Sequence, residues 1–66
     1  MRVKDLSITA ADKLRCCERE LRYRHRVYPQ LVASGKMSPG TADRELKVMA
    51  EVVEDLREQA EAEKLL

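Results

Sequence analysis

The stretch LVASGKMSPGTA, residues 31–42, is a short polar break between two longer stretches with helical periodicity. Gly35 suits the left-handed backbone conformation that commonly ends a helix. Ser38 followed by Pro39 is typical of the cap and first position of a new helix. The break therefore predicts a tight turn between two helices.

Apolar side chains recur on both sides of this break in alternating steps of three and four residues, which is the spacing of one helix face. The members before the break are Ala10, Leu14, Cys17, Leu21, Arg24, Tyr28 and Leu31, and those after it are Ala42, Leu46, Met49, Val53, Leu56 and Ala60. If the chain folds back at the break, Leu21 meets Val53 and Leu14 meets Ala60 in one register. We therefore predict an all-α fold, an antiparallel helical hairpin with these residues in the contact between its helices, here called the seam.

Local signals give the expected boundaries. Residues 1–9 are predicted to be an extended N-terminal arm, and 10–66 a single hairpin domain with helices at about 10–34 and 39–63. Thr9 and Asp12 have the spacing of a capping box at the start of the first helix. Pro29 removes a backbone donor inside that helix, so a kink or a stop and restart is expected there.

A second apolar group lies beside the seam. At about 100° per residue, Tyr23 and Val27 share one flank of the first helix, and Val48 and Val52 occupy the matching flank of the second. A hairpin of 66 residues buries little surface against an entropy cost of about 1.5 kcal/mol per ordered residue, so self-association is expected. We predict that Tyr23, Val27, Val48 and Val52 form a dimer interface that joins two hairpins into a four-helix bundle.

Charge is unevenly distributed although the net charge is only +1. Residues 1–37 hold nine Lys or Arg and four acids, whereas the remainder holds four bases and eight acids. A basic cluster of Arg19, Arg22, His25 and Arg26 predicts a contact with an acidic protein surface. Nucleic-acid phosphates are the alternative ligand, which the near-neutral net charge disfavours.

Arg24 interrupts the apolar seam, and a charge at that position needs a partner. The sequence offers Glu20 and Glu45 as candidates, or an outward path for the long side chain.

Residue types with catalytic or metal-binding chemistry are sparse. The adjacent Cys16 and Cys17 suit neither an ordinary disulfide nor a zinc site, and Cys17 is expected to be a small buried apolar residue. His25 is the single histidine and has no nucleophile at a catalytic spacing. No apolar run is long enough to span a bilayer, and residues 1–9 lack the apolar core of a signal peptide. We therefore expect a cytoplasmic protein that is not an enzyme and needs no cofactor.

Four short segments resemble the pattern R-V-Y-P-x-x-V-x-x-G-K-M-[ST]-x-x-x-A-D-x-E of a family of very short proteins from temperate phages and prophages of Gram-negative bacteria. The matching residues are Arg26-Val27-Tyr28-Pro29, Val32, Gly35-Lys36-Met37 and Ala42-Asp43-Arg44-Glu45. The match covers about residues 16–56. The pattern is similar to that of the quorum-sensing anti-activators of Pseudomonas phage. It implies a dimeric helical hairpin that binds and inhibits a host protein, notably a LuxR-type transcription regulator. A nucleic-acid-binding accessory protein and a structural or assembly dimer are the alternatives.

Overall fold

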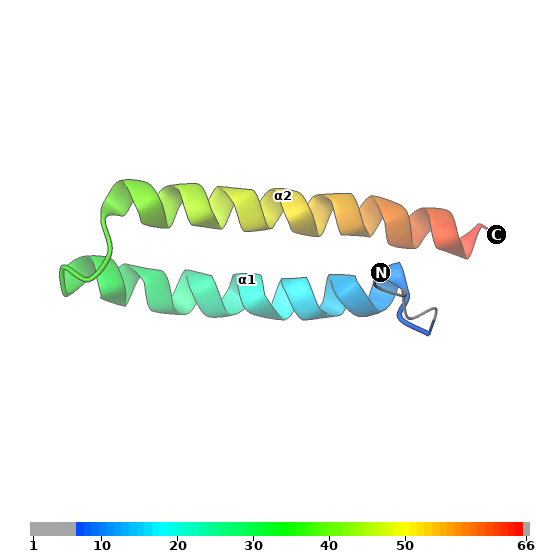
Figure 1. Cartoon of the computed structure of the whole chain (residues 1–66), viewed down its shortest axis with the longest axis horizontal. Helices are drawn as coiled ribbons and strands as arrows, with labels where there is room; N and C mark the ends of the chain where they lie inside the picture. The colour runs from blue at the N-terminus through cyan, green and yellow to red at the C-terminus, as the bar shows by residue number, and fades with distance from the viewer. Residues whose placement is uncertain (1–6, 66) are drawn as a thin grey trace, which may run out of the picture.

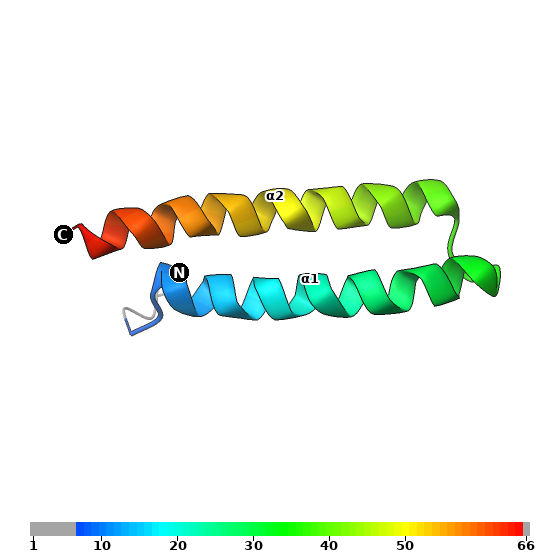
Figure 2. The same cartoon turned by 180° about the vertical axis from the view of Figure 1, so that it is seen from behind.

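The computed structural model describes residues 7–65, which form the helices α1 (Ala10–Ala33) and α2 (Pro39–Lys64). The two helices lie side by side and antiparallel, joined by residues 34–38 (Figures 1 and 2). No strand occurs in this part of the chain. The predicted all-α antiparallel hairpin is confirmed. Residues 1–6 of the predicted arm lie outside the described residues.

A capping box starts α1. The Asp12 backbone N–H donates to Thr9 Oγ1 at 3.1 Å, and the Thr9 backbone N–H donates to Asp12 Oδ2 at 3.0 Å. The hydrogen bond from the Thr9 backbone N–H to the carboxylate, and after it the one with the Thr9 side chain, hold the pKa of Asp12 below its usual value. The start of α1 is therefore fixed by two side chains that the sequence predicts.

The helix α1 continues through Pro29 and ends at Ala33. Of the two alternatives for Pro29, a kink or a stop and restart, the stop and restart is therefore wrong. Proline removes the backbone donor that would bond the carbonyl four residues earlier, at His25. Both Pro29 and His25 are exposed, so water can bond that carbonyl. The cost is confined to the last turns of α1.

The turn after α1 has the hydrogen bonds of a Schellman motif. The Lys36 N–H donates to the Leu31 carbonyl at 2.9 Å, and the Gly35 N–H donates to the Val32 carbonyl at 3.1 Å. Gly35 has φ +76°, the left-handed conformation that glycine adopts without a steric penalty.

The helix α2 then starts with a cap of its own. Ser38 Oγ accepts a hydrogen bond from the Thr41 N–H at 3.1 Å, and Pro39 occupies the first helical position. Pro39 is well suited there because a first-turn N–H has no partner within the helix. The polar break thus forms the predicted turn.

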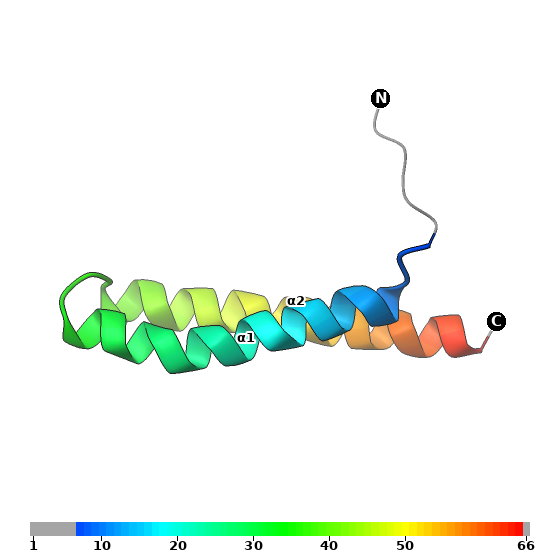
Figure 3. The same ribbon diagram turned by 90° about the horizontal axis from the view of Figure 1, so that it is seen from below.

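The hairpin has a thin core. Only Ala10, Ala42, Val53 and Ala60 are buried within residues 7–65, and none of the large side chains there is less than 2% exposed. The other seam residues are half-buried: Leu14, Cys17, Leu21, Arg24, Tyr28, Leu31, Leu46, Met49 and Leu56. Each helix is covered by the other on one side only, and the two cross at a shallow angle (Figure 3). Much of the apolar surface of the seam therefore stays accessible.

Two polar contacts join α1 to α2 at the open end of the hairpin. The Ala10 N–H donates to Glu63 Oε1 at 3.1 Å, and Arg57 Nη2 lies 3.3 Å from Glu18 Oε2. The Ala10 N–H is one of the free donors of a helix N-terminus, so Glu63 caps α1 from the other helix. These pairs lie where the predicted seam register puts them.

Candidate functional site

A group of exposed apolar side chains occupies one flank of the hairpin. Tyr23 on α1 is 49% exposed, while Val48 and Val52 on α2 are 43% and 36% exposed. Val27 belongs to the same flank and is half-buried. Together Tyr23, Val27, Val48 and Val52 are here called the apolar face. Large side chains of this kind, gathered on one side, leave apolar area in water that a second surface could cover.

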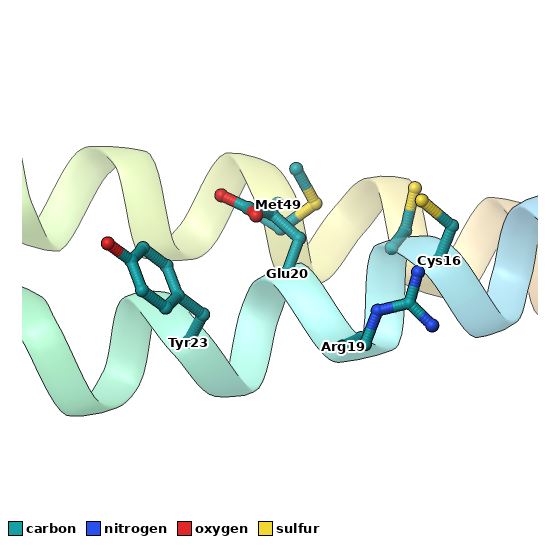
Figure 4. Close-up of a pocket in the computed structure, with 6 residues that line it drawn as sticks. Cys16, Arg19, Glu20, Tyr23 and Met49 are labelled. Atoms are coloured by element: carbon teal, nitrogen blue, oxygen red, sulfur yellow. The ribbon is translucent and has the colours of Figure 1, made fainter.

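An open groove of about 400 Å³ adjoins the apolar face at Tyr23. It is lined by Cys16, Cys17, Arg19, Glu20, Tyr23 and Met49. In Figure 4, Tyr23, Glu20, Arg19 and Cys16 follow one another along α1, and Met49 reaches in from α2. The groove is a surface depression that lacks an enclosing wall. Cys16 is exposed and Cys17 is only half-buried, so Cys17 is less enclosed than the sequence suggests.

Arg24 is held in place by acids of both helices. Its Nε donates to Glu20 Oε1 at 3.0 Å, and its Nη1 lies 3.7 Å from Glu45 Oε2 and 3.4 Å from the Glu45 carbonyl. The guanidinium carbon also lies 5.9 Å from the Tyr28 ring centroid. The hydrogen bond with Glu20 raises the pKa of Arg24 above its usual value. Arg24 therefore joins the two helices, as its predicted pairing with Glu20 or Glu45 requires.

Three other arginines follow the outer side of α1. Arg19, Arg22 and Arg26 are exposed and are separated by steps of three and four residues, so they share one face. We call them the arginine stripe. Within residues 7–65 none of the three has a carboxylate partner, although nearby Arg15 pairs with Asp12.

Arg26 and His25, two members of the predicted basic cluster, differ in their surroundings. The Arg26 guanidinium lies 5.6 Å from the ring centroid of Tyr23, which connects the arginine stripe to the apolar face. His25 is exposed and, by helical periodicity, lies next to Arg22 on the side away from the apolar face. The predicted cluster is thus continuous along α1 but spans two flanks.

A matching acidic stripe lies on α2. Glu51, Asp55 and Glu58 are exposed, share the outer side of α2, and have no ion pair or hydrogen bond through their side chains to any residue between 7 and 65. Val48, Val52, Glu51 and Asp55 line a second open depression together with Arg44 and Lys47. From sequence alone, this acidic stripe looks like an ordinary solvated face. The sequence feature that could have identified the stripe is the spacing of its three acids, which mirrors the spacing of the arginines on α1.

The described residues offer little for other chemistry. No three His, Cys, Asp or Glu side chains among residues 7–65 are grouped so that they could hold a metal ion. Neither α1 nor α2 is long and apolar enough to cross a membrane. No protein-family model, curated protein or solved structure matches this chain.

Proposed function

We propose that this protein is a homodimeric binding protein that acts without catalysis. Two hairpins associate through the apolar face into a four-helix bundle, and the basic side chains of α1 bind an acidic surface of another protein. The observation that carries this proposal is the exposure, on adjoining surfaces of α1, of arginines without carboxylate partners and of an aromatic ring.

The thin core supports association. Three of the four residues buried within 7–65 are alanines, so each of these three contributes little burial of side-chain area. At roughly 25 cal/mol per Å², covering Tyr23, Val48 and Val52 supplies stability that the hairpin lacks on its own. A four-helix bundle is the usual way for two helical hairpins to cover such faces.

The arginine stripe supports protein binding. A guanidinium presents five donors in a planar fork that matches a carboxylate in two parallel hydrogen bonds. Arg24 and Arg15 already bind carboxylates within the hairpin, whereas Arg22 has no carboxylate partner between residues 7 and 65. Arg22 and His25 also lie away from the apolar face, so they are accessible in the dimer.

The resemblance to short phage proteins supports a choice of partner. On that basis the bound protein is a host protein, with a LuxR-type quorum-sensing transcription regulator as the first candidate. The dimer inhibits it by occupying its surface in the bacterial cytoplasm. No cofactor is required for such a mechanism.

Nucleic-acid binding is the second candidate function, and the arginine stripe is the observation that favours it. The outer side of α2 is acidic, and the net charge of the chain is +1, so the basic surface is narrow. A phosphate-binding surface should lose affinity steeply as salt concentration rises.

The test compares wild type with an Arg22→Glu/His25→Glu variant. Lys36→Glu provides the control, because Lys36 is exposed at the turn, far from this surface. Each protein is used to capture partners from host lysate, the captured protein is purified and titrated, and DNA and RNA mobility shifts are run at low salt. The proposal expects saturable protein binding that the variant loses and the control keeps. Salt-sensitive nucleic-acid binding with no captured protein would contradict it, as would equal protein capture by the variant.

A further inference from the structure

The arginine stripe and the acidic stripe have matched spacing. Arg19, Arg22 and Arg26 are separated by three and then four residues, and Glu51, Asp55 and Glu58 by four and then three. Read in opposite directions, the two series coincide. Two helices that run antiparallel can therefore place Arg19 near Glu58 and Arg26 near Glu51.

These stripes cannot meet within one hairpin. The seam faces inward, and both stripes lie on the outer sides of their helices. Their side chains are exposed and lack ionic partners within residues 7–65, whereas Arg24, Glu45, Glu18 and Arg57 pair across the seam. A surface that complements both stripes is available on a second copy of the chain.

We propose that in the dimer α1 of each subunit lies antiparallel against α2 of the other subunit, with Arg19 and Arg26 paired to the partner's acidic stripe. This inference rests on the proposed dimer. Tyr23 then packs on the partner's Val52 and Val27 on the partner's Val48, since the seam register places each pair at the same level of the hairpin. The two-fold axis runs parallel to the helices.

The ion pairs lie at the edge of this apolar contact. Arg19 and Arg26 are the helical neighbours of Tyr23 at four residues before it and three after it, and Arg26 already lies against the ring. Glu51 and Asp55 border the depression that Val48 and Val52 line on α2. Helical side chains lean toward the N-terminus of their own helix, so in an antiparallel pair the two sets lean toward each other.

The alternative two-fold arrangement packs α1 against α1 and α2 against α2. It places the two arginine stripes side by side and the two acidic stripes side by side. Like charges in such proximity disfavour association, so they select against this arrangement. The charge pattern therefore selects one dimer among those that the apolar face permits.

This arrangement divides the basic cluster into two roles. Arg19 and Arg26 are engaged at the dimer contact. Arg22 and His25 point away from it and remain available for the host protein. The same helix thus serves both surfaces.

Charge exchange tests the pairing. An Arg19→Glu/Arg26→Glu variant and a Glu51→Arg/Glu58→Arg variant should each raise the dimer dissociation constant about tenfold or more, because four pairs become repulsions. Combining all four substitutions in one chain should restore the wild-type constant. If α1 packs on α1 instead, each arginine stripe faces a like charge in the wild type and still does so after its charges are reversed. An unchanged dimer dissociation constant in the double variants would therefore overturn the inference. Circular dichroism of each variant verifies that the helices form.

Disulfide mapping tests the arrangement independently of charge. In a Cys16→Ser/Cys17→Ala background, chains carrying Tyr23→Cys are mixed with chains carrying Val52→Cys and oxidised. Covalent dimers should form between the two kinds of chain, and Tyr23→Cys alone should give none. Covalent dimers of Tyr23→Cys alone would overturn the arrangement while leaving the dimer intact. A wild-type chain that sediments as a monomer would overturn the dimer proposal and this inference together.

Discussion

The guanidinium of Arg26 lies 5.6 Å from the centroid of the Tyr23 ring, three residues earlier on α1. This contact connects the two exposed features of the hairpin, since Tyr23 belongs to the apolar face and Arg26 to the arginine stripe. An arginine over an aromatic ring keeps its charge accessible while its planar face contacts the ring. Tyr23 and Arg26 are therefore positioned to act together when a second surface covers them.

The seam predicts a coupled pair of core substitutions. Val53→Ala should lower the free energy of unfolding by about 2 kcal/mol, because it removes two methyl groups from a side chain that is only 4% exposed. Leu21→Ala should cost about 2 kcal/mol, at the lower end for leucine because Leu21 is half-buried. Urea unfolding of both single variants and the double variant forms the measurement. The two losses should not add, and full additivity would place these residues out of contact.

The two glycines predict opposite effects of alanine. Gly35→Ala should destabilise the hairpin by about 1 kcal/mol or more, because Gly35 has φ +76°. Gly40→Ala should stabilise it by about 0.4–1 kcal/mol, because Gly40 lies within α2 and an added Cβ meets no atom within 4 Å. Thermal unfolding of the pair compares them directly. Equal shifts in Tm would contradict the assigned backbone conformations.

The capping box predicts a dependence on pH. The pKa of Asp12 is lowered in the folded chain by the hydrogen bonds with Thr9, so the carboxylate stabilises the fold at pH values above its unfolded pKa. That contribution should disappear as the pH falls through the lower, folded value. Comparing Tm with an Asp12→Asn variant between about pH 7 and pH 2 measures it. The two curves should converge at acid pH, and a constant difference would argue against the cap.

Removing the other half of the capping box gives a second prediction. Thr9→Ala should lower the free energy of unfolding by about 1 kcal/mol, because the Asp12 N–H loses its acceptor at the helix start. Thr9→Ser retains an acceptor oxygen and serves as the matched control. Urea unfolding of the two variants separates loss of the cap from loss of the threonine methyl group. A serine variant as weak as the alanine variant would assign the effect to packing.

The hairpin itself could be predicted from the sequence because its determinants are local or periodic. Thr9 with Asp12, Gly35, and Ser38 each set an element boundary through hydrogen bonds or backbone conformation within a few residues. The periodic seam identifies which sides of the two helices face each other. Such signals depend on helix geometry alone and need no knowledge of distant contacts.

Other features depend on context that the periodicity does not contain. The sequence leaves open whether Pro29 kinks α1 or ends it, and the helix continues because only one carbonyl, near an exposed end, loses its donor. Cys17 has a seam position yet stays half-buried, since α2 covers α1 on one side only. The acidic stripe of Glu51, Asp55 and Glu58 can be recognised only from the contacts, which give these carboxylates no partner within residues 7–65.

The proposed dimer predicts the effect of charge on the apolar face. Val48→Glu/Val52→Glu should place four carboxylates in the contact between subunits, and burial of these charges without partners disfavours association. In the proposed dimer the thin core makes folding depend on association, so the variant should be monomeric or largely unfolded at micromolar concentration. Circular dichroism across a concentration series measures the loss. An exposed pair elsewhere on α2, Glu54→Gln/Glu61→Gln, should leave the dimer unchanged.

The central claim is that the folded unit is a dimer, and sedimentation equilibrium of the wild-type chain tests it most directly. The chain has a mass of 7.6 kDa. A dimer should sediment as a single species of twice that mass at micromolar concentration, with helical content that falls as dilution separates the subunits. A species of 7.6 kDa that keeps its full helical content at micromolar concentration would contradict the account.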